Sequence, residues 1–411
     1  MRPALALLVL LAAAPARAGT ASFGIGRFME DPPPVVSADG WHFAVLGIRR
    51  GELVEDGRVI VENVGPAKMT TDMDEHSDRY GDYTFALSRD GRVLAYPMQV
   101  RARDGSVLGQ GMGINGSEVG GVYRKVVRAW VSPGGANAAF LVETEKGFGI
   151  VSAQGNGPVF PEQPTDVFAA DGGIVYLIDW QGRKWVYRDH KPQTQKDYRW
   201  LVESPDLRRS LGAVASPAGK QRILLDGKTV GAWPIVTLGG FSGDGRRYFV
   251  IAGDGASGSR PDLVVADGAV HRSPPGAVYA AFSPDGELWW YCYDGNKTTV
   301  FRAGRPVGSW PGDTASLRHW IAFSPDGRHW AALVGLDLIV DGTVAAKDVP
   351  PAPKTTRLVF DSDNELHYLA STGFAGGYVS IVCATLDGSS AEKGACAAKF
   401  AAIYGGLASK R

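Results

Sequence analysis

Short apolar segments separated by polar turns recur along the whole chain, and many of them come in pairs. In Ile321–Gly335, IAFSPDGRHWAALVG, apolar residues lie on both sides of the turn Ser324–Gly327. Proline presets the backbone for the second position of a type I turn, and serine or aspartate can bond nearby amides. Glycine adopts the left-handed conformation that begins a bulge. Each such segment therefore predicts two paired β-strands.

The same pattern occurs nine times, in strong and weak forms. Its serine, or the residue that replaces it, stands at positions 37, 88, 132, 169, 204, 242, 283, 324 and 361, a mean spacing of about 40 residues. A period in this range is typical of repeat proteins. The chain is therefore expected to form one array of similar units and not two or three unrelated domains.

A second turn with Asp-Gly follows the first within most units. It lies in the segments Leu53–Ile60, Arg101–Leu108, Ile223–Val230, Leu263–Val270 and Leu338–Ala345. Two hairpins in each unit make four strands, which is one blade of a β-propeller. Blades repeat because a single small sheet cannot bury both of its faces.

The predicted fold class is therefore all-β, a closed β-propeller of four-stranded blades. Nine units are counted, whereas propellers typically close with four to eight blades. Units four and five, near positions 169 and 204, lack a clean Pro-Asp-Gly turn, so that one of them could belong to a neighbour. We therefore expect seven to nine blades.

The sequence FSPDG followed by an apolar strand, at this period, resembles the WD40-like repeats of TolB-type β-propellers. The resemblance covers nearly the whole chain after its first residues and implies the propeller fold. TolB proteins also carry an α/β domain ahead of the propeller and work in a periplasmic envelope complex. Only residues 19–34 separate the leader described next from the first unit, so that role is not expected here.

The first residues have the pattern of a secretory signal peptide, assigned to residues 1–18. Arg2 is followed by the apolar stretch Ala4–Ala14 and by a small-x-small cleavage signal at Ala16–Ala18. No cysteine follows the apolar stretch, so a lipoprotein is not expected. The sequence thus predicts an exported bacterial protein, periplasmic or extracellular.

Two further segments complete the expected organisation. Residues 19–34 form an N-terminal extension, in which Ala21–Met29 is a candidate ring-closing strand that would pair into the last blade and remove an exposed edge. Residues 35–411 form a single propeller domain.

Charge and hydropathy exclude two classes of partner. The chain has 43 basic and 43 acidic residues and no basic run that could follow phosphates, so neither nucleic acid nor an anionic membrane surface is expected as a partner. Beyond the leader, no segment approaches the roughly 20 apolar residues of a membrane span, so no membrane insertion is expected.

Strand order indicates which end of the propeller could bind a ligand. Both turns of each unit lie at one end, and the connections between strands two and three and between units lie at the other. The long insertions all fall in the second class: Gly65–Tyr83, Gln110–Arg124, Gly253–Asp262 and Ser371–Tyr378. Variable loops on a rigid scaffold often carry binding residues, so this long-loop face is expected to bind a protein or polysaccharide.

The longest insertion is rich in carboxylates. Asp72, Asp74 and Asp78 alternate with other residues in the way that a loop wraps oxygen ligands around Ca²⁺. The segment matches an EF-hand poorly, because His76 and Ser77 stand where a ligand and the required glycine belong. A Ca²⁺ site and a solvated acidic loop are both open, and no other cofactor is indicated.

Three cysteines are present. In an oxidising compartment Cys383 and Cys396 could form a disulfide across a last hairpin around Gly388, which leaves Cys292 as a buried free thiol. The alternative is three reduced, partly buried thiols.

Three functions are compatible with these features. The first is an exported binding or scaffold propeller without catalysis, the second a propeller enzyme acting on a polysaccharide or other polymer, and the third a subunit of a cell-envelope assembly. No G-x-S-x-G nucleophile motif occurs, and the repeats leave no room for a separate hydrolase domain. The sequence identifies neither catalytic residues nor the ligand.

Overall fold

The computed structural model describes most of the chain after residue 18. The described residues are 19–27, 35–37, 39–46, 52–55, 58–62, 85–180, 183–195, 198–216, 219–256, 258, 260–314, 320–349, 357–372, 378–387, 390–391 and 394–408. Within them, 36 strands form nine antiparallel sheets of four strands each. The predicted all-β propeller is confirmed, and its blade count lies within the predicted range.

Blades one to five follow one another along the chain. Their strands are β2–β5 (Val35–Val36, Phe43–Leu46, Glu52–Glu55, Arg58–Glu62), β6–β9 (Ala86–Leu87, Leu94–Arg101, Val107–Ile114, Ser117–Tyr123), β10–β13 (Lys125–Val131, Ala138–Thr144, Gly147–Ser152, Gly155–Phe160), β14–β17 (Thr165–Ala170, Gly173–Trp180, Arg183–Arg188, Lys191–Gln195) and β18–β21 (Tyr198–Glu203, Ser210–Ala215, Gln221–Leu225, Lys228–Trp233). Units four and five, with their irregular first turns, are thus complete blades.

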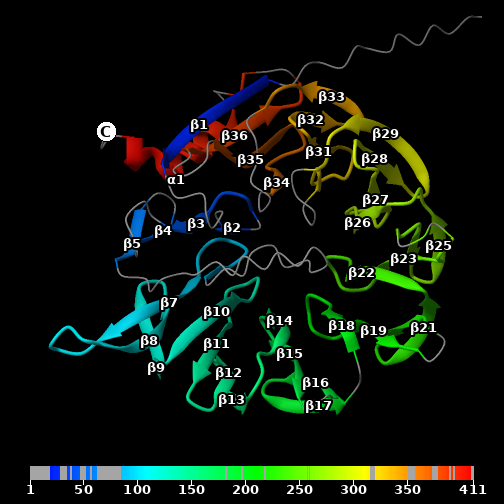
Figure 1. Ribbon diagram of the computed structural model, residues 1–411. Coiled ribbons are helices and arrows are strands. Elements are labelled where there is room, and N and C mark those ends of the chain that lie inside the picture. The colour runs from blue at the N-terminus through cyan, green and yellow to red at the C-terminus, as the bar shows by residue number, and fades with distance from the viewer. Residues whose placement is uncertain are drawn as a thin grey trace, which may run out of the picture.

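Blades six to nine complete the ring. Their strands are β22–β25 (Ile235–Phe241, Tyr248–Gly253, Leu263–Ala266, Ala269–Arg272), β26–β29 (Ala277–Phe282, Leu288–Tyr293, Lys297–Arg302, Arg305–Pro311), β30–β33 (Ile321–Phe323, Trp330–Val334, Asp337–Val340, Thr343–Ala346) and β34–β36 (Leu358–Phe360, Glu365–Thr372, Tyr378–Thr385) with β1 (Gly19–Arg27). β1 is the outer strand of the ninth blade and pairs antiparallel with β36. Figure 1 shows the blades around a ring, with β1 beside β36.

The core lies between the blades. Buried apolar side chains form nine clusters, and each cluster joins two neighbouring sheets. In β23, Tyr248 and Val250 pack toward blade five, whereas Phe249 and Ile251 pack toward blade seven. Alternate residues of a strand point to opposite faces, which is why these blades are apolar on both faces.

One of the nine clusters joins the last blade to the first. It contains Trp41 and Phe43 of blade one together with Leu369 and Ile381 of blade nine. We call this interface the closing seam. The ring is therefore closed by packing as well as by the pairing of β1.

The turn between the first and second strands explains why Ser-x-Asp-Gly recurs. The buried Oγ of Ser324 donates to Asp326 Oδ1 at 2.6 Å and accepts the N–H of His329 at 2.9 Å, while Gly327 has a φ of 71°. The serine hydroxyl thus bonds both sides of the turn. The same bond to the aspartate occurs at Ser37, Ser88, Ser204, Ser242 and Ser283.

In blade three, the carboxylate that accepts the serine hydroxyl belongs to a residue of blade four. Gly134 stands where the other turns have aspartate, and Ser132 Oγ donates instead to Asp171 Oδ1 of blade four at 2.6 Å. The N–H of Gly134 also bonds Asp171, at 3.0 Å. The buried amide of Asn137 donates to the carbonyl of Asp171 at 2.8 Å. The missing aspartate is therefore replaced across the interface between two blades.

The sequence interpretation of blade two was wrong in one respect. The turn within Arg101–Leu108 joins the second and third strands, β7 and β8, and not the third and fourth. Gln110–Arg124 is accordingly no loop, because it forms most of β8 and all of β9. Its glycines weaken the strand pattern but make room for aromatic rings: a Cβ at Gly113 would overlap the ring of Tyr96.

The chain after β36 also differs from the expectation. In place of a last hairpin around Gly388, the helix α1 (Ala395–Ala408) follows and packs on β1, β35 and β36. Cys396, Phe400, Ile403 and Tyr404 lie on its buried side. Their spacing of four, three and one residues is typical of one face of an amphipathic helix.

Candidate functional site

The two ends of the propeller differ in their connections. Because antiparallel strands alternate in direction, the first and last turns of every blade lie at one end, the tight-turn end, and the other connections lie at the long-loop end. The last turns are short and uniform, as at 226–227, 267–268 and 341–342. Connections at the long-loop end include 254–262, 312–320 and 347–357. Variation in chain length is thus concentrated at the long-loop end.

The connection 254–262 in blade six is bonded to the end of β25 and to the connection that leads from it to blade seven. Arg272 Nη1 donates to Asp254 Oδ2 at 3.2 Å, and the N–H of Asp254 bonds Asp262 Oδ1 at 3.3 Å. The N–H of Ser273 bonds the carbonyl of Asp262 at 2.8 Å. Hydrogen bonds of Asp254 and Asp262 thus join the two connections at the long-loop end.

A β-bulge recurs near the long-loop end of the inner strands. In β10, β14, β18, β22 and β26 the pairing register with the second strand shifts by one residue. The extra residue is Arg199 in β18 and Thr237 in β22, and both side chains are exposed. Bulges re-aim side chains and often lie next to functional sites. Arg199 and Thr237 are thus candidate ligand contacts.

The hairpin of β7 and β8 extends beyond its blade at the same end. Figure 1 shows it reaching outward from the ring. Its tip exposes 53% of Val107 and 61% of Leu108, and Arg101 donates to the carbonyl of Gly105 at 3.0 Å. The hairpin of β7 and β8 therefore presents an apolar surface near its tip.

The predicted metal ligands Asp72, Asp74 and Asp78 lie outside the described residues. Within the ranges that the structure describes, no group of three or more His, Cys, Asp and Glu side chains could hold a metal ion. The Ca²⁺ site stays a prediction from sequence.

A serine and a histidine meet between blades three and four. Ser152 Oγ lies 2.8 Å from His190 Nε2, and His190 Nδ1 lies 3.3 Å from Tyr176 Oη. Burial lowers the pKa of His190, although the charge of Asp189 partly opposes this. Ser152 also donates its one proton to Gln154 Oε1 at 2.8 Å, which leaves none for an imidazole base. The pair is therefore best explained as a hydrogen bond that joins two blades.

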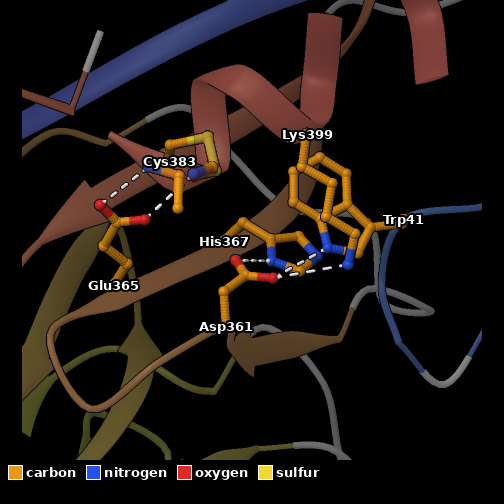
Figure 2. Close-up of a disulfide and its surroundings, with 8 residues drawn as sticks. Trp41, Asp361, Glu365, His367, Cys383 and Lys399 are labelled. Atoms are coloured by element: carbon orange, nitrogen blue, oxygen red, sulfur yellow. Dashed lines mark hydrogen bonds and ion pairs between the residues drawn. A yellow bond between two sulfur atoms is a disulfide. The ribbon is translucent and has the colours of Figure 1, made fainter. Parts of the chain in front are cut away.

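A buried polar cluster lies at the closing seam, and Figure 2 shows it. Asp361 Oδ2 is 2.6 Å from Nδ1 of the fully buried His367, and Asp361 Oδ1 accepts the indole N–H of Trp41 at 2.9 Å. Lys399 Nζ of α1 is 3.8 Å from Asp361 Oδ1. Burial opposes ionisation of Asp361, but the hydrogen bonds from His367 and Trp41 and the charge of Lys399 outweigh it and lower its pKa. The cluster joins the first blade, the last blade and α1.

A disulfide joins Cys383 of β36 to Cys396 of α1, with 6.0 Å between their Cα atoms. It does not cross a hairpin, since Cys396 lies in the first turn of the helix. The carboxylate of Glu365 accepts the N–H groups of Ala395 and Cys396 at 3.1 and 3.0 Å, so it caps the helix N-terminus (Figure 2). The disulfide and the cap thus fix the start of α1 on blade nine.

Cys292 is a buried free cysteine in β27. Its Sγ is 2.8 Å from Ser273 Oγ, which also accepts the indole N–H of Trp290 at 3.1 Å. Burial raises the pKa of the thiol to about 11, although the bond to Ser273 partly opposes this. A thiol in this state is a weak nucleophile, so Cys292 has a packing role.

Sequence reasoning missed both the closing seam and the bulges. The alanine-rich segment Ala395–Ala408, with buried residues spaced four, three and one apart, contains a detectable helix signal. The bulges have no such signal, because they depend on how the second strand pairs with the first.

No protein-family model matches this chain, and no curated protein matches it. Solved structures align with most of it at low identity. A eukaryotic initiation factor is 13% identical, with 89% of this chain and 96% of that chain covered and a TM-score of 0.48. The Dos1 propeller is 10% identical, with 74% and 92% covered and a TM-score of 0.39.

The β-propeller domain of the trilobed protease from Pyrococcus furiosus is 11% identical, with 72% of this chain and 93% of that chain covered and a TM-score of 0.37. Likeness with these TM-scores carries no argument about this chain. The nine four-stranded sheets confirm the WD40-like propeller expected from the repeats, and the narrower TolB-type relationship stays a prediction. In the part of the chain that the structure describes, no helix has the length and apolar character needed to cross a membrane.

Proposed function

We propose that this chain is an exported binding or scaffold propeller without catalysis, and that it holds a protein or polymer ligand on its long-loop end. The observation that carries this proposal is the contrast between the two ends. Serine and aspartate side chains at the tight-turn end bond within their own turns. At the long-loop end, connections vary in length and bulges expose Arg199 and Thr237. Binding residues are disproportionately found on such connections.

The polar groups described at the seams support a role without catalysis. Ser152 and His190, Asp361 and His367, and Arg188 and Glu203 are each bonded to one another. The first and third pairs each join two neighbouring blades, whereas Asp361 and His367 both lie in blade nine and are joined to blade one by Trp41. Burial or a further hydrogen bond limits the reactivity of each pair. This favours binding over an enzymatic role.

Export is supported by two features. The first 18 residues have the pattern of a signal peptide. The disulfide between Cys383 and Cys396 is typical of a protein that folds in an oxidising compartment. Expression from the native start should therefore give periplasmic or extracellular protein whose first residue is Gly19. Cytoplasmic protein that retains Met1 would contradict export.

Photo-crosslinking can identify which end of the propeller binds the ligand. A photoreactive amino acid is placed at Arg260, exposed in the connection 254–262, or at Arg246, exposed at the tight-turn end. We expect crosslinks to a cell-envelope protein or polymer from position 260 and none from position 246. Arg199→Glu should weaken the crosslink from position 260, and Arg246→Glu is the matched control that should not. Crosslinks only from position 246 would overturn the choice of end.

Catalysis is tested on the captured ligand. The purified protein is incubated with it for hours, and its size distribution is measured by chromatography and mass spectrometry. We expect no shortened products. Turnover of the ligand would contradict the role without catalysis while leaving the binding surface intact.

A further inference from the structure

The closing seam is held by contacts that the other seams do not have. Trp41 of blade one is bonded from the outside by α1: Tyr404 Oη donates to its carbonyl oxygen, and Lys399 Nζ lies 4.7 Å from the centre of its ring. The indole N–H of Trp41 bonds Asp361 of blade nine. The helix therefore covers the place where the ring closes.

The attachment of α1 to blade nine depends on its first turn. Cys396, the second residue of the helix, is bonded covalently to Cys383 on β36, and Glu365 caps the neighbouring N–H groups. The helix has 14 residues and carries Gly405 and Gly406 near its end. A helix of this length is marginal in water unless packing holds it in place. Its order thus depends on the disulfide and on the apolar face beneath.

We propose that α1 and the Cys383–Cys396 disulfide form a redox-controlled latch, and that reduction of this bond releases α1 and loosens the closing seam before the rest of the ring. The latch is defined as α1 together with Cys383. Its release removes cover from Trp41, Leu369 and Ile381 of the seam cluster. The eight other clusters contain no residue of α1 and keep their contacts.

The chemical step requires a dithiol as reductant. One thiolate of the dithiol attacks a sulfur of the disulfide, the S–S bond breaks, and the leaving sulfur takes up a proton. The second thiol of the reductant resolves the mixed disulfide. Two electrons and two protons are transferred, so that Cys383 and Cys396 become thiols and the dithiol becomes a cyclic disulfide.

Burial protects the disulfide from reductants. Cys383 is 0% exposed and Cys396 is 2% exposed, so a reductant reaches the sulfurs only when the packing around the disulfide opens transiently. Once the bond is broken, only the cap from Glu365 and the apolar face hold the helix. The oxidised latch is therefore the resting state, and reduction favours the open one.

Hydrogen exchange with mass spectrometry tests the proposal on the full-length protein. Folded protein is compared before and after dithiothreitol treatment and alkylation. We expect exchange at 39–44 and 395–408 to accelerate roughly tenfold or more, with no change at β23 in blade six. Unchanged exchange at both segments, or equal acceleration in all blades, would overturn the latch.

Three variants complete the test. Cys292→Ser removes the thiol outside the disulfide, and it should respond to dithiothreitol as the parent does. The Cys383→Ala, Cys396→Ala double variant should show the open pattern without reductant; if it fails to fold, the chemically reduced parent still decides the question. Tyr404→Phe keeps the disulfide, and it should accelerate exchange at 39–44 while the start of α1 stays protected. Full protection at 39–44 in this variant would contradict the contact between the latch and blade one.

Discussion

At the scale of single residues, the buried serine of the first turn has an effect larger than its size suggests. Ser324 is 0% exposed, and its hydroxyl both donates to Asp326 and accepts from His329. Removing the hydroxyl leaves the half-buried backbone N–H of His329 without its acceptor. Such a group costs stability even though a single hydrogen bond adds only modestly to it.

We therefore predict that Ser324→Ala lowers the free energy of unfolding by about 1–3 kcal/mol. The matched control is Ser309→Ala, because Ser309 is exposed and bonds only another hydroxyl in the described residues. Urea unfolding of both variants provides the measurement. Equal unfolding midpoints for the two variants would contradict this role of the turn serine.

The aspartate in the turn between the third and fourth strands accepts a hydrogen bond from the second strand. Asp341 has a φ of 49°, and its Oδ1 accepts the N–H of Trp330, the first residue of the second strand, at 3.0 Å. The same bond is made by Asn115, Asp189, Asp226 and Asp267. In blade seven the equivalent residue is Ala303, with a φ of 46° and no side chain that could accept the N–H of Leu288.

We predict that Ala303→Asn stabilises the protein by about 1 kcal/mol, since it adds the missing bond to Leu288 and suits the left-handed backbone. Ala153→Asn is the control, because Ala153 is exposed in a comparable turn but has no positive φ. Thermal melts of both variants are compared with the parent. A lower melting temperature for Ala303→Asn would show that this turn cannot accept the side chain.

At the scale of elements, one buried carboxylate lies between blades four and five. Glu203 at the end of β18 bonds Arg188 Nη2 of β16 at 3.3 Å, and Arg188 also donates to the carbonyl of Leu207 at 2.9 Å. Burial raises the pKa of Glu203 to about 7, although Arg188 partly opposes this. The folded protein thus holds a proton that the unfolded chain releases at lower pH.

This difference makes stability depend on pH with a definite sign. The contribution of Glu203 is fully present below the carboxyl pKa of the unfolded chain, and it is lost as the pH rises toward about 7. We predict that Glu203→Gln removes this decline. Between pH 5 and pH 8, the free energy of unfolding of the variant should rise by about 2–3 kcal/mol relative to that of the parent. Urea unfolding at both pH values measures this difference. Glu118→Gln is the control, because Glu118 is exposed. If the stability of the parent and of Glu203→Gln changed in parallel with pH, the prediction would be wrong.

At the scale of the whole molecule, stability is distributed over nine similar seams. Each blade buries both faces only because a neighbour covers each of them, and the last blade covers the first. In a repeat array of this kind, most interfaces involve nearest neighbours in the sequence. The closing seam is the exception, and it is the one that carries a disulfide and a helix.

A bound ion would stabilise the whole molecule by mass action. If Asp72, Asp74 and Asp78 bind Ca²⁺, we expect excess CaCl₂ to raise the melting temperature and a chelator to reverse the rise. Changing the three residues to asparagine should abolish the shift and leave the metal-free melt almost unchanged. A melt that responds to none of these changes would reject the metal hypothesis.

Much of the fold could be predicted from local sequence. A turn such as Ser324–Gly327 depends on residues within a few positions of one another, so its signal is complete in a short segment. Nine copies of that signal, with a second turn in most of them, determined four strands for each unit and the propeller class. The same strand order determined which connections share an end.

Other features were decided only by the tertiary structure. Trp41 bonds Asp361 at a separation of 320 residues, and Asp171 completes the turn of Ser132 from the next blade. The sequence predicted that Ala21–Met29 pairs into the last blade, and the structure decided its partner, β36, and the register of the pairing. These contacts exist because ring closure brings the first and last blades together, and no local pattern contains that proximity. The sequence by itself therefore determined the blades, whereas the tertiary structure decided what joins them.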